Sequence, residues 1–296
     1  MNKNIQLNPD IISRLNNLSL KARMVVEGFI VGLHKSPYHG FSVEFSEHRA
    51  YGYGDEIKHI DWKLFGKTDR FYIKQFEEET NLRSYILFDQ SKSMEYGSNH
   101  ITKLEYAQLL SASLSYLMIK QQDAVSLTLF DDKIVHYIPP RSKSSHLKII
   151  LSKMEQIQSG NDTKISPVLH QTAEMIKKKG LIILISDLFD NPDDIISGLK
   201  HFRYKGHEVV VFHILDNKEL NLDFDQNTRF KDIETGEEII TQPWHIKNDY
   251  QKSINDFCKN FKNQFRINHI DYVVLPTNES LDLALTEYLI KRKKIM

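Results

Sequence analysis

The sequence predicts a doubly wound α/β fold: a mainly parallel sheet of six strands with helices on both faces, preceded by an N-terminal α+β extension. From Arg83 onward, short β-rich runs alternate with segments of helical periodicity, which is typical of crossover units. Two of the runs, residues 181–185 and 209–212, are apolar without interruption, as expected of central strands covered on both faces. The sheet domain is therefore assigned to residues 81–296 and the extension to residues 1–80.

The extension combines a helical pattern with a polar, aromatic segment. Residues 11–33 have a helical period that is interrupted at Asn16-Asn17. Residues 42–45 and 71–76 alternate between apolar and polar side chains, as half-exposed strands do. Residues 49–62, which lie between them, are too polar for a core and too aromatic for a disordered linker. This segment is therefore treated as a candidate surface.

The first half of the sheet domain is expected to contribute three strands and one helix. Residues 84–88 form the first strand. Apolar side chains then recur at steps of three and four over residues 104–118, which predicts an amphipathic helix. Residues 124–130 form the second strand, and the turn at Asp131-Asp132 leads into residues 134–138, an antiparallel strand at the edge of the sheet.

The second half continues with alternating helices and strands. A helix covers residues 147–157, and another opens at Ser166-Pro167 with serine as N-cap and proline as first helical residue. Asn191-Pro192 opens a helix in the same way, and Gly206 ends it. Residues 209–212 form the next strand, and a hairpin turn is expected at Thr235-Gly236. A long helix over residues 247–265, a strand over 270–275 and a terminal helix from Thr277 complete the domain.

Charge and composition limit the classes of partner. Lys plus Arg and Asp plus Glu each total 39, so the chain lacks the basic surplus that binding to nucleic acid normally needs. Cys258 is the only cysteine, which excludes an internal disulfide and suits a reducing compartment. No apolar stretch approaches the length of a membrane span, and the first residues have no apolar signal core. We therefore expect a cytoplasmic chain without nucleic-acid partners or membrane insertion.

The residues that carry chemistry follow two buried strands. Asp89, Ser91 and Ser93 lie directly after the first strand, and Asp187 follows the run at 181–185. If the two strands are neighbours at the point where strand order reverses, these side chains meet at one edge of the sheet, where ligands bind in open α/β sheets. Carboxylate and hydroxyl oxygens suit Mg²⁺ or Mn²⁺, and two facing carboxylates repel each other without a cation. Thr163 is expected to reach the same place.

Asp89-x-Ser91-x-Ser93, Thr163 and Asp187 resemble the metal-ion-dependent adhesion site of von Willebrand factor A-type (vWA) domains, with all five positions filled. The residues upstream are similar to the signature of the bacterial family called domain of unknown function fifty-eight, which leads into such a domain. One departure is Lys58-His59, where the family usually has an arginine. The signature residues are Gly40-Phe41, Glu44-Phe45, Arg49, Tyr51, Gly54-Asp55, Ile60-Asp61-Trp62-Lys63, Thr68-Asp69-Arg70, Lys74, Phe76-Glu77 and Glu79-Thr80.

The resemblance implies a vWA-like fold and a noncatalytic protein-binding module. A bound Mg²⁺ or Mn²⁺ would be completed by an Asp or Glu of a partner protein, and members of the family commonly accompany an AAA+ ATPase of the MoxR type in chaperone-like assembly or maturation. Asp89 and Asp187 would supply charge. Ser91 and Ser93 would be the most direct ligands, since neutral hydroxyls leave the cation attractive to an incoming carboxylate.

The extension supplies the candidate partner-binding residues Arg49, Asp55, Asp61 and Trp62. One interpretation places them on a partner surface beside the metal crevice. The other is structural: the acids cap turns, Trp62 fills a gap in a flap docked on the sheet, and Arg49 pairs with an acid. The sequence leaves both open.

Two other functions compete with metal-dependent protein binding. The first is a hydrolase or phosphoesterase that uses Mg²⁺ or Mn²⁺ at the same site, since a bound cation can activate water. Against an enzyme, Ser91 stands where an aspartyl phosphotransferase needs a second acid, and the chain has no nucleotide-binding or nucleophile-elbow motif. The second is a structural scaffold with an empty site, in which the serines only cap the following helix.

Overall fold

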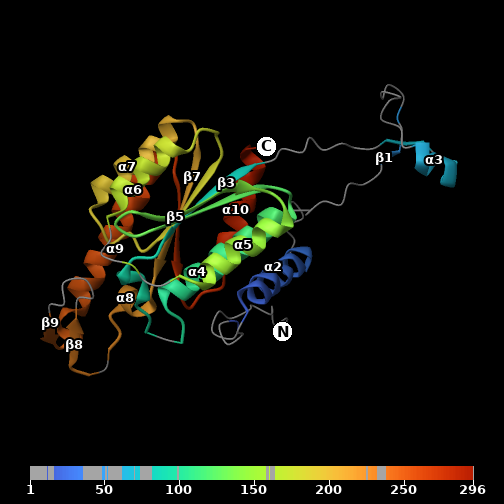
Figure 1. Cartoon of the computed structure of the whole chain (residues 1–296). Helices are drawn as coiled ribbons and strands as arrows, with labels where there is room; N and C mark the ends of the chain where they lie inside the picture. The colour runs from blue at the N-terminus through green and yellow to red at the C-terminus, as the bar shows by residue number, and fades with distance from the viewer. Residues whose placement is uncertain are drawn as a thin grey trace.

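The main sheet has six strands in the order β10-β7-β6-β3-β4-β5 (Figure 1). Only β5 is antiparallel to its neighbour, so the predicted doubly wound, mainly parallel fold is confirmed. The strands are β3 Arg83–Asp89, β4 Ala124–Phe130, β5 Ile134–Arg141, β6 Leu181–Ser186, β7 Glu208–Leu215 and β10 Asp271–Pro276. This computed structural model describes residues 12, 17–35, 49–50, 52, 62–69, 71–73, 82–98, 100–157, 160, 164–224, 226–231 and 238–295.

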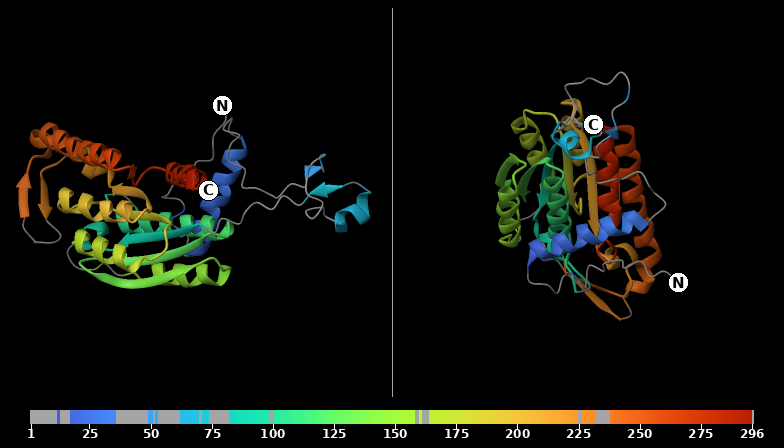
Figure 2. Two further views of the ribbon diagram at one scale, coloured as in Figure 1. Left: turned by 90° about the horizontal axis from the view of Figure 1, so that it is seen from above. Right: turned by 90° about the vertical axis from the view of Figure 1, so that its right-hand side faces the viewer.

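Helices cover both faces of the sheet and form two cores. On one face lie α4 Lys103–Lys120, α5 Ser144–Glu155 and α10 Asp282–Ile295; on the other lie α6 Ile165–Met175, α7 Pro192–Tyr204 and α9 Pro243–Ile267 (Figures 1 and 2). The strand β3 serves both cores, because Ile86 and Phe88 point to the first and Tyr85 and Leu87 to the second. All four side chains are 3% exposed or less, as expected of a central strand.

The first long helix of the extension packs on the sheet domain. This helix, α2 Leu18–Lys35, lies against α4 and α5 (Figure 1). Its buried residues include Ala22, Val26 and Phe29, which join the same core as α4. Asn17 caps its first turn by accepting a hydrogen bond from the backbone N–H of Leu20 at 2.9 Å, which accounts for the interruption in the sequence pattern. This part of the extension therefore shares the core of the sheet domain.

The other elements are short. In the extension, β1 Arg49–Ala50 pairs with β2 Tyr72–Ile73, and α3 Trp62–Thr68 lies between them in the chain. The predicted strand at 42–45 lies outside the described residues. After β7 come α8 Asn217–Asn221 and the predicted hairpin, formed by β8 Thr228–Lys231 and β9 Glu238–Thr241. No helix within the described ranges combines the length and apolarity needed to cross a membrane.

Two predicted helix starts are wrong, and contacts from elsewhere in the fold explain both. The helix α6 starts at Ile165, one residue before the predicted cap Ser166, and the Ile165 N–H is bound by the Asp190 carboxylate at 2.9 Å. The helix α10 starts at Asp282, not at Thr277, because the Thr277 N–H is bound to the Leu215 carbonyl at the end of β7. The predicted cap of α7 by Asn191 is confirmed.

The outer strand β5 contains two consecutive prolines, Pro139 and Pro140. Its register with β4 shifts there, since Ile138 pairs with Leu127 and Arg141 with Val125. Two residues of β5 thus face one residue of β4, which is a bulge at the edge of the sheet. Edge strands and bulges are where a sheet tolerates proline.

Candidate functional site at the carboxyl edge of the sheet

The carboxyl ends of β3 and β6 meet where the strand order reverses. From β3 the chain passes through α4 to β4 on one side, and after β5 it returns through α5 and α6 to β6 on the other side. Because β3 and β6 are parallel neighbours, Asp89 at the end of one and Asp187 just after the other come to the same edge. The structure therefore brings the two predicted carboxylates together at the switch point.

The Asp89 carboxylate is fully buried and held at both oxygens. Its Oδ1 accepts a hydrogen bond from the Ser91 N–H at 2.9 Å, and its Oδ2 accepts one from the Ser186 hydroxyl at 2.6 Å. Burial and then the charge of Asp187 raise the pKa of Asp89 to about 7, although the bonds from Ser186 and Ser91 act in the opposite direction. A nearby positive charge would relieve this repulsion.

The two predicted serine ligands converge. The hydroxyls of Ser91 and Ser93 form a hydrogen bond, with their oxygens 3.1 Å apart. Adjacent ligands of an octahedral Mg²⁺ with bonds of about 2.1 Å are separated by about 3 Å, so this pair has the spacing of two neighbouring positions on such an ion. No group of three or more His, Cys, Asp or Glu side chains is placed to hold a metal in the part of the chain that the structure describes. A cation here would therefore depend on hydroxyl ligands.

A lysine that sequence reasoning missed is paired with Asp187. The Lys103 ammonium lies 2.7 Å from Asp187 Oδ2 and 2.7 Å from Glu219 Oε1, and its side chain is 1% exposed. Burial lowers the pKa of Lys103, but the charges of Asp187 and Glu219 outweigh it and leave the pKa raised. The other oxygen, Asp187 Oδ1, accepts a long bond of 3.4 Å from the Phe189 N–H and no other hydrogen bond from a residue that the structure describes. Asp187 therefore keeps one oxygen for a further cation.

One signal in the sequence marks Lys103. It is the first residue of α4, after the N-cap Thr102 and two residues before the capping Glu105. A cation at a helix N-terminus faces the positive end of the helix dipole, where acids are preferred. A lysine in that position, unless exposed, needs carboxylates from elsewhere, and here they come from the loop after β6 and from α8.

Thr163 lies outside the described residues. The residues on either side of it are anchored at this edge: the Gly160 N–H donates to the Gln90 carbonyl at 2.8 Å, and the Ile165 N–H donates to Asp190 at 2.9 Å. Its place among the ligands stays a prediction.

His213 holds the loop that follows β6 and contains Asp187. Its Nε2 lies 2.8 Å from the Asp187 carbonyl, and because a carbonyl can only accept, Nε2 carries the proton and donates. In the neutral ring Nδ1 is then the acceptor, and it accepts from the Tyr272 hydroxyl at 2.6 Å. The ring is fully buried, and both of its nitrogens are bonded. The next residue along this loop, Leu188, has a left-handed backbone with φ of 55°, which costs free energy for a side chain with a Cβ. The loop is thus fixed by contacts that outweigh local strain.

We expect His213 to make the protein sensitive to acid. Burial lowers its pKa to about 4 from 6.5, so its contribution to stability is complete above pH 6.5 and is lost as the pH falls towards 4. The free-energy difference between wild type and His213→Gln should shrink by about 3 kcal/mol over that range, measured by urea unfolding. The exposed His100→Gln is the control. A difference that does not change with pH would contradict this prediction.

Of the candidate residues of the extension, Trp62 is the one whose side chain the structure describes. Asp55 and Asp61 lie outside the described residues, as does the side chain of Arg49. Trp62 is 58% exposed on α3, where its ring contacts Phe65 and Phe71. Figures 1 and 2 show α3 apart from the six-stranded sheet. A partner surface at these residues stays a prediction.

The family follows from a match over most of the sheet domain. Residues 47–257 match the family model described as protein of unknown function DUF58. The chain belongs to the DUF58 family. The predicted family is therefore confirmed, and the match includes Asp89, Ser91, Ser93 and Asp187.

Relatives of this DUF58 chain are distant, and the solved structures support its fold. The uncharacterized proteins Mb1516 of Mycobacterium bovis and Rv1480 of Mycobacterium tuberculosis are each 22% identical over 231 residues, covering 77% of this chain and 72% of theirs. The structure of BatB from Bacteroides thetaiotaomicron is 19% identical with a TM-score of 0.51, covering 72% of this chain and 99% of that one. An aerotolerance-related membrane protein from Bacteroides fragilis is 17% identical with the same TM-score of 0.51, covering 71% and 99%. The fold is the predicted vWA-like one.

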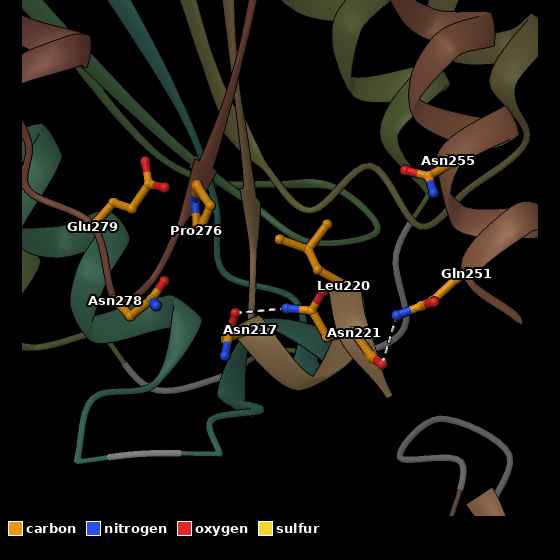
Figure 3. Close-up of a pocket in the computed structure, with 8 residues that line it drawn as sticks. All are labelled: Asn217, Leu220, Asn221, Gln251, Asn255, Pro276, Asn278 and Glu279. Atoms are coloured by element: carbon orange, nitrogen blue, oxygen red, sulfur yellow. Dashed lines mark hydrogen bonds between the residues drawn. The ribbon is translucent and has the colours of Figure 1, made fainter. Parts of the chain in front are cut away.

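A second hollow of this DUF58 chain lies farther along the same edge, after β7 and β10 (Figure 3). It encloses about 430 Å³ and is lined mostly by carboxamides. Asn221 Nδ2 donates to Asn217 Oδ1 at 2.8 Å, and Gln251 Nε2 donates to the Asn221 carbonyl at 3.1 Å. The lining is mostly neutral and polar, so this hollow is distinct in chemistry from the charged site at Asp89 and Asp187.

Proposed function

We propose that this chain is a noncatalytic, metal-dependent protein-binding module. Mg²⁺ or Mn²⁺ is held by Asp89, Ser91, Ser93, Thr163 and Asp187. The partner protein supplies an Asp or Glu, and the chain cooperates with a MoxR-type AAA+ ATPase in chaperone-like assembly or maturation. A vWA-like fold supports a protein-interaction role in general. The proposed location is the cytoplasm, because a partner ATPase needs ATP.

The observation that carries the proposal is the spacing of the two serine hydroxyls. Ser91 Oγ and Ser93 Oγ lie 3.1 Å apart, close to the separation of about 3 Å between adjacent ligands of Mg²⁺. They are at the switch point between β3 and β6, with the buried Asp89 and Asp187 on the same edge. When bound, the cation supplies an open coordination position for a carboxylate of the partner.

Each residue of this set has a separate role. Ser91 and Ser93 offer neutral oxygens directly to the cation. Asp187 offers charge through Oδ1, while its Oδ2 remains bound to Lys103. Asp89 fixes the loop by accepting a hydrogen bond from the Ser91 N–H, and its carboxylate adds negative charge close to the cation.

The hydrogen bonds of Asp89 support a noncatalytic role over hydrolysis. Both of its oxygens accept hydrogen bonds from this chain, from the Ser91 N–H and from the Ser186 hydroxyl. A general base must reach the proton that it removes, whereas the Asp89 side chain is 0% exposed. His213 is equally committed, with both ring nitrogens bound.

Thermal unfolding tests the metal site. In wild type, millimolar Mg²⁺ or Mn²⁺ should raise the unfolding midpoint relative to EDTA, by about 5 °C or more at a hundredfold excess over Kd. Asp187→Ala and Ser93→Ala should lose this shift, whereas the exposed Ser142→Ala should retain it. The half-buried Ser93 is the safer variant, because its replacement leaves Lys103 paired. No shift in wild type, or an equal shift in all variants, would overturn the metal site.

One observation favours a second candidate, a structural scaffold that needs no metal. Lys103 already places a positive charge on Asp187 and is shared with Glu219. The same unfolding measurement separates the two functions, because the scaffold predicts a midpoint that does not respond to cations.

A further inference from the structure

An aromatic pocket opens beside the hydroxyls of Ser91 and Ser93, which we call the serine site. We define the aromatic pocket by Ser93 and Lys103 on the sheet side, Phe189 after β6, and Lys218, Phe224 and Phe230 around α8 and the β8–β9 hairpin; it encloses about 460 Å³. Ser93, whose hydroxyl lies 3.1 Å from that of Ser91, is part of its wall. A molecule in the aromatic pocket therefore lies next to the proposed metal ligands.

The wall of the aromatic pocket combines rings with cations. Phe224 and Phe230 meet edge to face with ring centroids 5.3 Å apart, and the Lys218 ammonium lies 4.5 Å from the Phe224 centroid. The Lys103 ammonium lies 4.8 Å from the Phe189 centroid. Phe189 is 38% exposed although it is large and apolar. Such a wall favours an apolar side chain that has a negative charge next to it.

The positive charge of the wall is only partly neutralised. Lys103 is paired with Asp187 and Glu219. Lys218 contacts the Phe224 ring and interacts electrostatically with Asp223, but no described carboxylate lies within ion-pair distance of its ammonium. An acidic ligand thus gains attraction from Lys218 without displacing an existing ion pair.

The hairpin extends the apolar wall away from the sheet. Phe230 of β8 is directly opposite Ile239 of β9, so both side chains lie on the same face of the hairpin. Ile239 is 66% exposed. Figures 1 and 2 show β8 and β9 projecting beyond the carboxyl edge of the sheet. An apolar strip that leads out of a pocket fits an extended segment of protein better than a small enclosed ligand.

We infer that the aromatic pocket binds a large apolar side chain of the partner, on a segment whose neighbouring Asp or Glu reaches the serine site. The occupant is an acidic peptide with a phenylalanine or leucine close to the acid. This inference rests on the proposed function, to which it adds the sequence that a partner must contain. The pocket supplies affinity for the apolar residue and the site supplies affinity for the carboxylate.

Short fluorescent peptides test the inference on the full chain. Each carries one Asp and one Phe, adjacent or separated by one, two or three glycines, with Asp→Asn and Phe→Ala versions as controls. In Mg²⁺, fluorescence polarisation should show binding at one spacing, weakened about tenfold or more by either change in the peptide. Phe189→Ala and Lys218→Glu should weaken it similarly, whereas Tyr204→Ala and Lys200→Glu, both exposed on α7, should not.

The variants separate failure of the pocket from failure of the metal site. If EDTA and Ser93→Ala abolish binding but Phe189→Ala and Lys218→Glu bind as wild type does, the pocket inference is overturned and the metal site stands. If the pocket variants lose binding while EDTA has no effect, the pocket stands and the metal proposal fails. Absence of binding by every peptide at millimolar concentration, or equal binding of the Phe→Ala peptides, also overturns the inference.

Discussion

Lys103→Met should lower the free energy of unfolding by about 3 to 5 kcal/mol at neutral pH in EDTA. Lys103 is 1% exposed and its ammonium lies 2.7 Å from both Asp187 and Glu219. Methionine fills similar space but leaves the buried Asp187 and the partly buried Glu219 without a counter-charge, beside an Asp89 that already repels Asp187. Urea unfolding of wild type and variant measures the loss directly.

Two further variants identify the cause of this loss. Lys120→Met, at the exposed end of the same helix, should change stability by less than about 0.5 kcal/mol. Lys103→Met/Glu219→Gln should recover part of the loss because it removes one of the unpaired charges. If the proposed function is correct, Mg²⁺ should also stabilise Lys103→Met more than wild type, since the cation replaces the missing charge. A loss below about 1 kcal/mol would contradict the importance of this pair.

Val26→Asp should destabilise the sheet domain by about 4 kcal/mol or more, although Val26 precedes the first strand of the sheet by many residues. Its side chain is 0% exposed and belongs to the core that α2 shares with α4. An aspartate there has to be buried without a partner, or α2 has to leave the domain and expose that core. Chemical unfolding followed by circular dichroism measures the change.

The same helix provides a matched control. Val31 is 53% exposed on α2, and Val31→Asp should change the free energy of unfolding by no more than about 0.5 kcal/mol. Equal effects of the two substitutions would show that α2 is not part of the folding unit.

Local chemistry in the sequence predicts most of the fold. The uninterrupted apolar run at 181–185 predicts the central strand β6, and Asn191-Pro192 predicts the start of α7, because cap and proline act within one turn. The predicted starts of α6 and α10 are wrong because distant residues determine them. Asp190 from a different loop binds the first N–H of α6, and Leu215 of β7 holds Thr277 outside the helix. Contacts that come from distant segments have no local pattern.

The candidate site also has a part that the sequence predicts and a part that it does not. Asp89 and Asp187 can be predicted to meet because parallel strands end at the same edge of a sheet, and β3 and β6 are neighbours. The cation between Asp187 and Glu219 cannot, since Lys103 is 84 residues from the first and 116 from the second. A lysine at the start of a helix is unusual, but its partners are known only once α4, β6 and α8 are packed.

The bulge at Pro139-Pro140 limits how this protein can associate with others. Proline has no N–H to donate, so this stretch of the outer edge of β5 cannot form a continuous hydrogen-bonded ladder with an incoming strand. Recruitment of a partner by strand addition, and edge-to-edge polymerisation of copies, are both disfavoured on this side of the sheet. This edge of the sheet is therefore protected from acting as a template for aggregation.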